Sequence, residues 1–223
     1  MSRLLFALAW AVGGALVGVA LNYLSRWLAR IEEIEFRQSL RESVLMPALT
    51  AGLFFVFALQ LGVQPLLFIN SVYVTVLVQV LGFDLKTRYI LDFVMFPSWV
   101  IAFALAFVTP WTPALTWPWP DWRTAPVAGL IAGGLFLVLF LGGQLIFGAE
   151  AFGFGDVKLA VFIGLATGLS NLRMAHAILD GVFLGGFVAI ILLITRIRTF
   201  RDAVPYGPFL VLGTLLVLYS QAP

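Results

Sequence analysis

The chain has 223 residues, of which 62% are hydrophobic and 11% are charged. A soluble domain has about 45–50% apolar and about 25% charged residues, so this composition excludes an ordinary soluble domain. The formal net charge of +2 does not favour nucleic acid as a partner. Cysteine is absent, which excludes disulfides, a thiol nucleophile and cysteine-ligated zinc or iron–sulfur sites. We predict a single membrane domain over residues 1–223, with the lipid bilayer around it.

Eight apolar segments, separated by charges or by Pro and Gly, follow one another along the chain. They cover residues 4–24, 45–62, 65–83, 89–108, 126–148, 157–170, 175–195 and 204–219. The first is longer than the core of a signal peptide, so we expect it to be a helix. A full crossing needs about 17–25 helical residues, which makes 157–170 the short segment and a candidate re-entrant one. We predict an all-α polytopic bundle of about eight transmembrane helices.

The basic residues predict the orientation of this bundle. With the N-terminus outside, ten of the 13 Lys and Arg residues lie on one side: Arg26, Arg30, Arg37, Arg41, Lys86, Arg88, Lys158, Arg196, Arg198 and Arg201. The positive-inside rule places that side in the cytoplasm of the cell, and it favours eight crossings over a re-entrant sixth segment. The Trp- and Pro-rich stretch 109–122 then lies on the outer side, at the level of the lipid headgroups.

Two acidic residues lie at expected helix ends on the cytoplasmic side. Asp84 is part of Gly82-Phe83-Asp84-Leu85-Lys86, and Asp156 ends Gly153-Phe154-Gly155-Asp156. Two close carboxylates can share one proton, so that one activates water and the other polarises a scissile carbonyl. Gly153 and Gly155 have no Cβ atom, which lets a substrate strand approach the backbone beside the acid. The two acids therefore fit aspartic-protease chemistry.

Each acid also has a structural interpretation. Asp156 follows a Gly-rich turn and precedes an apolar run, which is typical of a helix N-cap. Asp84 fits a solvated ion pair with Lys86 or Arg88. Asp92 lies four residues after Arg88, a helical pairing distance.

Two further titratable residues lie near or within the seventh apolar segment. Asp180 is inside 175–195, where an acid is costly in lipid and faces the bundle interior, either for function or to form hydrogen bonds. His176 is the single histidine of the chain, and one histidine cannot form a usual zinc site. We therefore expect no metal and no metal ligands.

At these residues the chain resembles the type IV prepilin peptidase family, which are membrane aspartyl proteases of the GxGD type. Gly153 to Leu159, read as GFGDVKL, is similar to the family signature GxGDxKL. Phe83-Asp84, followed by Asp92, is similar to the segment that carries the first catalytic aspartate. The VPYGPFL segment, 204–210, is similar to the Pro-aromatic-Gly-Pro-Phe segment. In the first apolar segment, Leu21-Asn22 is similar to a Leu-Asn pair of bacterial members, so the resemblance covers essentially the whole chain.

The resemblance implies an aspartic endopeptidase without a cofactor, whose catalytic residues are Asp84 and Asp156. Its substrates would be type IV prepilins or pilin-like precursors, whose leader peptides it would cleave at the cytoplasmic face of the cell membrane. The residues implied to support the site or bind substrate are Gly153, Gly155, Lys158, Asp92, Pro205, Gly207 and Pro208.

The chain departs from the family pattern at two places. Many bacterial relatives have a four-cysteine zinc knuckle after the first span, associated with N-methylation, whereas residues 25–44 form a short cysteine-free loop here. We therefore predict that the chain has no methyltransferase activity. Leu91 replaces the proline that precedes the second acid of the first-aspartate segment.

Three other interpretations of the chain stay open. One is a proton-coupled transporter, since acids in broken membrane helices also mark ion paths. Another is an intramembrane protease of the presenilin type, which would cut within a helix. The third is an inactive relative that binds pilin-like proteins.

Overall fold

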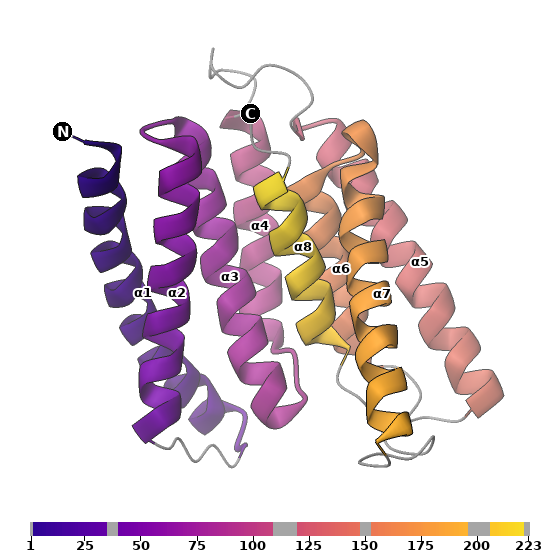
Figure 1. Cartoon of the computed structure of the whole chain (residues 1–223). Coiled ribbons are helices and arrows are strands. Elements are labelled where there is room, and N and C mark those ends of the chain that lie inside the picture. The colour runs from indigo at the N-terminus through magenta and orange to yellow at the C-terminus, as the bar shows by residue number, and fades with distance from the viewer. Residues whose placement is uncertain (1, 35–39, 109–119, 148–152, 196–205, 221–223) are drawn as a thin grey trace. The chain divides into compact units, whose positions relative to one another are not determined.

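A computed structural model of the chain describes residues 2–34, 40–108, 120–147, 153–195 and 206–220. These residues form eight α-helices and one short 3₁₀ turn, without a strand among them, which confirms the all-α prediction (Figure 1). Five helices are long and apolar enough to cross a membrane: α1 (Arg3–Ile31), α2 (Leu40–Leu61), α3 (Pro65–Thr87), α5 (Thr124–Phe147) and α7 (Arg173–Ile194). The shorter helices are α4 (Asp92–Val108), α6 (Phe154–Thr167) and α8 (Gly207–Ser220), and the 3₁₀ turn is η2 (Ser170–Leu172).

The chain divides into two compact units, one with α1 to α3 and the other with α4 to α8. The single membrane domain stays a prediction. In the first unit α1 packs closely on α2, because glycine at position 18 lets the two backbones approach. A Cβ atom on Gly18 would lie 2.8 Å from the backbone nitrogen of Pro47. Small residues serve this purpose in membrane helices, since lipid supplies no hydrophobic force between them.

Polar side chains join the helices of the first unit. The Asn22 amide donates a hydrogen bond of 2.7 Å to the carbonyl oxygen of Ser43, which links α1 to α2. Ser25 of α1 and Gln79 of α3 are both buried, and the Gln79 amide donates a hydrogen bond of 3.0 Å to the Ser25 hydroxyl. These contacts supply the partners that polar groups need where water is absent.

The predicted loop 25–44 is too long. α1 continues to Ile31, and α2 already begins at Leu40. The charges that we interpreted as loop residues lie on the exposed side of a continuing helix: Arg26 is exposed, whereas Leu28 is buried. The pattern of buried apolar residues therefore continues through the charged stretch, on the opposite side of the helix.

In the second unit α6 is the central helix. It contacts α4, α5, α7 and α8, and ten of its 14 residues are buried. This explains why the predicted sixth segment is short, since a helix enclosed by other helices is not matched in length to the lipid. At its end the backbone N–H of Gly168, at a φ of 68°, donates a hydrogen bond of 2.9 Å to the carbonyl oxygen of Gly164. The turn η2 follows and leads into α7.

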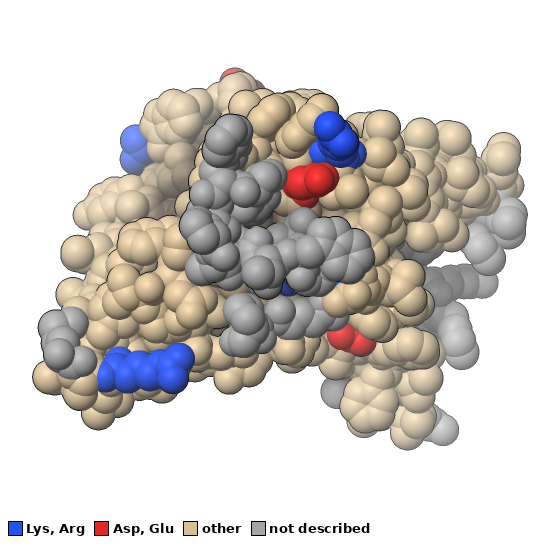
Figure 2. Space-filling model, turned by 90° about the horizontal axis from the view of Figure 1, so that it is seen from above, with Lys and Arg blue, Asp and Glu red and all other residues tan. Residues whose placement is uncertain are grey.

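Some predicted features lie outside the described residues. They are the part of the Trp- and Pro-rich stretch from 109 to 119, and Pro205. Figure 2 shows one face of the molecule, on which charged side chains of the described residues form separate groups in a mostly uncharged surface. The described part of that face has no continuous basic patch of the kind that binds nucleic acid.

Candidate active site

Asp84 lies in the last turn of α3 and is buried. The residue is 5% exposed to solvent, and its Oδ2 atom has no hydrogen-bond partner among the described residues. Asp84 is therefore not solvated as predicted, although the positive charge of Arg88 does act on it. A buried carboxylate oxygen without a partner is costly, which is typical of a residue kept for function.

The backbone after Asp84 ends the helix. The N–H of Arg88 donates a hydrogen bond of 2.8 Å to the carbonyl oxygen of Asp84, and Arg88 itself has a left-handed conformation with a φ of 56°. α4 begins four residues later, at Asp92. Arg88 and Asp92 therefore do not share a helix, and the predicted helical pairing between them is wrong.

Asp156 lies in the first turn of α6 and is also buried, at 9% exposed. The N-cap residue of this helix is Gly153, in an extended conformation, and the N–H of Asp156 donates a hydrogen bond of 3.1 Å to the Gly153 carbonyl oxygen. The N-cap interpretation of Asp156 is therefore wrong. Its carboxylate lies instead at the positive end of the helix dipole, three residues into the helix.

Gly155 has a packing role that the sequence did not reveal. A Cβ atom on Gly155 would lie 2.8 Å from the Cβ atom of Ile90, in the segment that precedes α4. The space beside Gly155 is thus filled by the protein, so the predicted approach of a substrate strand at this glycine is not supported. Gly153 is exposed, and a Cβ atom there would make an ordinary contact of 3.6 Å with Asp156 Oδ2.

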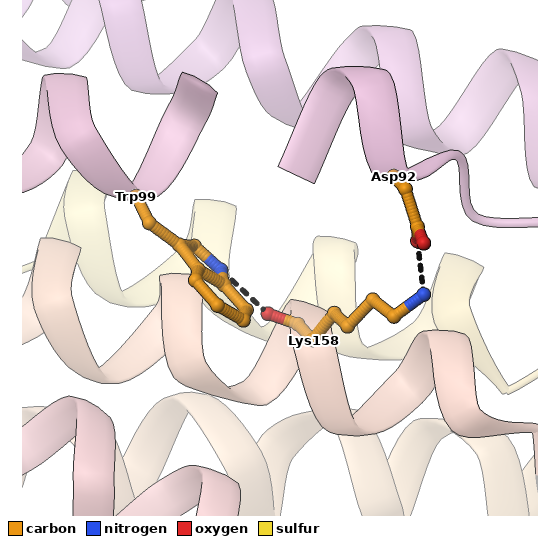
Figure 3. A network of polar contacts seen from close by, with 3 residues as sticks. All are labelled: Asp92, Trp99 and Lys158. Atoms are coloured by element: carbon orange, nitrogen blue, oxygen red, sulfur yellow. Dashed lines mark hydrogen bonds and ion pairs between the residues drawn. The ribbon is translucent and has the colours of Figure 1, made fainter. Parts of the chain in front are cut away.

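Lys158 joins α6 to α4 in two ways (Figure 3). Its ammonium group forms a salt bridge with Asp92 Oδ1, at the first residue of α4. Its carbonyl oxygen accepts a hydrogen bond of 3.0 Å from the indole Nε1 of Trp99. The family resemblance implied supporting roles for Lys158 and Asp92 but not for Trp99, because nothing in an apolar span marks one indole as a hydrogen-bond donor.

Phe154, the variable residue of the GFGD motif, extends this cluster. Its ring centroid lies 4.9 Å from the Lys158 ammonium nitrogen and 5.5 Å from the ring centroid of Phe140 in α5. A cation over an aromatic face is attracted by the ring quadrupole. The first two turns of α6 are therefore held by both α4 and α5.

The start of α8 lies near Asp156. The negative charge of Asp156 acts on the Tyr206 hydroxyl, which is half-buried. Tyr206 directly precedes α8, where Gly207 and Pro208 are buried. The family resemblance implied such a position for this segment, although it did not single out Tyr206. The only signal in the sequence was its place as the aromatic residue of VPYGPFL.

Two titratable residues of α7 lie in less distinctive surroundings. Asp180 is half-buried and His176 is exposed. Within the described parts of the chain, no three His, Cys, Asp or Glu side chains lie together as a metal site requires.

Comparison with known proteins relates the chain to a protein family. Residues 71–195, which include both Asp84 and Asp156, match the model of the type IV leader peptidase family. Over 101 residues the chain is 34% identical to proteins named prepilin leader peptidase/N-methyltransferase from Burkholderia pseudomallei strains 1026b and K96243. The match covers 44% of this chain and 32% of those relatives, about a third of their length. No solved structure matches the chain.

Proposed function

Because the chain belongs to the type IV leader peptidase family, we propose that it is a membrane aspartic endopeptidase with Asp84 and Asp156 as its catalytic carboxylates. The observation that carries this proposal is that each acid is buried at the end of a helix within the matched segment. Burial of a carboxyl group disfavours its charged form, so two acids buried at helix ends are candidates for a functional site. The substrate class proposed is type IV prepilins and pilin-like precursors.

The proposed reaction is hydrolysis of a peptide bond by water. One carboxylate, in its ionised form, takes a proton from the water molecule as the oxygen attacks the scissile carbonyl. The other, in its protonated form, donates a hydrogen bond to the carbonyl oxygen and stabilises the tetrahedral intermediate. Collapse of the intermediate breaks the C–N bond, and the leaving amine takes up a proton. The reaction uses no cofactor.

We place this reaction at the cytoplasmic face of the inner membrane. The support is the distribution of Lys and Arg between the apolar segments, which follows the positive-inside rule when Asp84 and Asp156 are cytoplasmic. A precursor would present a short basic leader followed by an apolar helix. The helix would stay in the bilayer, and the bond before it would be cut.

The test is cleavage of a purified prepilin by Asp84→Asn and Asp156→Asn variants, followed on a gel. An amide keeps the size of the carboxylate but cannot share the proton, so each variant should lose about 10³-fold or more in rate. Glu33→Gln, at an exposed acid outside the matched segment, is the matched control and should cleave at the normal rate.

Full activity of either aspartate variant would overturn the assignment of that residue. Absence of cleavage by the unaltered protein would instead favour the transporter or the inactive relative. Membrane insertion of each variant is checked by its resistance to extraction with alkaline carbonate.

A further inference from the structure

Polar contacts at two separate points join the start of α6 to α4. Trp99 lies seven residues after Asp92, about 10 Å further along α4 at 1.5 Å per residue. Both residues contact Lys158, one at the ammonium group and the other at the backbone carbonyl (Figure 3). Two contacts so far apart on one helix determine the rotation of α6 about its axis as well as its position along it.

Ile90 adds a third contact, against Gly155. Asp156 therefore lies between two residues that make these contacts, since Gly155 precedes it and Lys158 follows two residues later. Any rotation of the first turn of α6 would move the Asp156 carboxylate and would break one of these contacts. The contacts all lie within the unit formed by α4 to α8.

The salt bridge between Lys158 and Asp92 lies partly at the surface, where an ion pair adds little stability. The Asp92 side chain is 50% exposed, whereas that of Lys158 is 12% exposed. An ion pair with an exposed partner contributes little to the free energy of unfolding, because water screens it and both side chains lose freedom. What it does supply is a defined geometry between the first residue of α4 and the second turn of α6.

We propose that Asp92 and Lys158 are positioning residues, which hold the first turn of α6 so that the Asp156 carboxylate keeps its place for catalysis. This inference rests on the proposed function of Asp156. It assigns Asp92 a role through Lys158 and not at the reacting atoms. Trp99 completes the arrangement by holding the backbone of the same residue.

The test compares kcat and KM of single and paired variants on a purified prepilin. Asp92→Asn and Lys158→Gln should each lower kcat by about 10- to 100-fold, the loss that a displacement of about 1 Å produces, with KM changed less than threefold. The double variant Asp92→Asn with Lys158→Gln should be no slower than the slower single variant, because the two residues act as one unit. Arg123→Gln removes an exposed cation that lies over the Trp122 ring, and it is the control expected to leave kcat unchanged.

Exchange of the two charges separates positioning from direct catalysis. The variant with Asp92→Lys and Lys158→Asp restores an ion pair between α4 and α6, so it should recover at least about fivefold in kcat over the single variants. Lys158→Arg keeps the charge and should retain most of the activity. If neither recovers activity while Asp92→Asn is as inactive as Asp156→Asn, Asp92 acts on the substrate and the proposal is overturned.

A second measurement does not depend on activity. Amide hydrogen exchange of residues 157–161 should accelerate at least about threefold in Lys158→Gln, while exchange in α7 stays unchanged. Unchanged exchange in α6, or full activity of both single variants, would overturn the positioning role and leave the assignment of Asp84 and Asp156 intact. Full activity of Asp156→Asn would instead remove the proposed function itself.

Discussion

Gly164 of α6 lies directly against the backbone of Ala128 in α5, because a Cβ atom on Gly164 would overlap the Ala128 carbonyl group and lie 2.6 Å from the nitrogen of Gly129. Backbone atoms cannot move aside as a flexible side chain can. Gly164→Ala should therefore separate α5 from α6 and destabilise the protein by about 1–3 kcal/mol. The expected result is a melting temperature lower by about 2–10 °C in detergent.

Gly134 supplies the control for this prediction. It lies in α5, and a Cβ atom there would meet nothing within 4 Å. Gly134→Ala should leave the melting temperature unchanged or raise it slightly, since alanine is the better helix former. Equal losses in the two variants would show that the contact with Ala128 is not what requires glycine at 164.

The hydrogen bonds of Asp121 predict that the stability of the folded protein depends on pH. Its Oδ1 atom accepts hydrogen bonds of 2.7 Å from the Thr124 N–H and of 3.1 Å from the Arg123 N–H, at the start of α5. The bond from the Thr124 backbone, more than any other contact, holds the pKa of Asp121 below its ordinary value of 3.8. A carboxyl whose pKa is lowered by folding stabilises the folded state above its ordinary pKa, and this stabilisation is lost as the pH falls through the folded value.

The measurement is thermal unfolding in detergent between pH 6 and pH 3. The unaltered protein should lose more stability than Asp121→Asn over the range below about pH 4, by up to about 1 kcal/mol for a half-buried cap. At pH 6 the Asn variant should be the less stable of the two, since a neutral amide oxygen is the weaker acceptor. Parallel pH curves for the two proteins would contradict this role of Asp121.

The orientation can be tested by thiol labelling, because the chain has no cysteine of its own. Single cysteines at Thr87 and Thr199 should be protected from a membrane-impermeant reagent in intact cells, whereas one at Trp117 should react. Positions 117 and 199 lie outside the described residues, and Thr87 is the last residue of α3. Reaction at position 87 from outside would place Asp84 on the wrong side for a cytoplasmic leader.

Methylation of the new N-terminus is the activity on which this chain and its relatives are expected to differ. The relatives are named as bifunctional enzymes, whereas the connection between α1 and α2 is short and lacks cysteine here. So short a segment is too small to fold as a cofactor domain without a metal or a disulfide. The mature substrate should therefore have the same mass whether S-adenosylmethionine is present or absent during cleavage. A gain of one methyl group with the cofactor would contradict this prediction.

The sequence predicted the helices of this protein better than their contacts. Each of the eight apolar segments corresponds to a helix, because length and hydropathy are local properties that the bilayer selects directly. The predicted end of the first helix, at residue 24, is too early, because Arg26 and Arg30 are typical of a loop in sequence but lie on the exposed side of a helix.

The site required information that a linear pattern does not contain. The four-residue spacing predicts a pairing of Asp92 with Arg88, but α3 ends at Thr87 and Arg88 has a left-handed conformation. The partner of Asp92 is Lys158, 66 residues away, and the donor to the Lys158 carbonyl is 59 residues away. Such pairs arise only when α4 and α6 pack together.

The hydrogen bonds between Ser25 and Gln79 limit how the first unit can assemble. Both side chains are buried in helices that the bilayer surrounds. No water is present there to form hydrogen bonds with an amide that lacks a protein partner. Sliding α1 by one turn along α3 would move Ser25 by about 5 Å and leave the amide unsatisfied. Leucine and valine faces tolerate such slippage, because one apolar contact replaces another. Together with the hydrogen bond of 3.0 Å that the Trp10 indole donates to the Ser71 hydroxyl, this pair sets the register of α1 against α3.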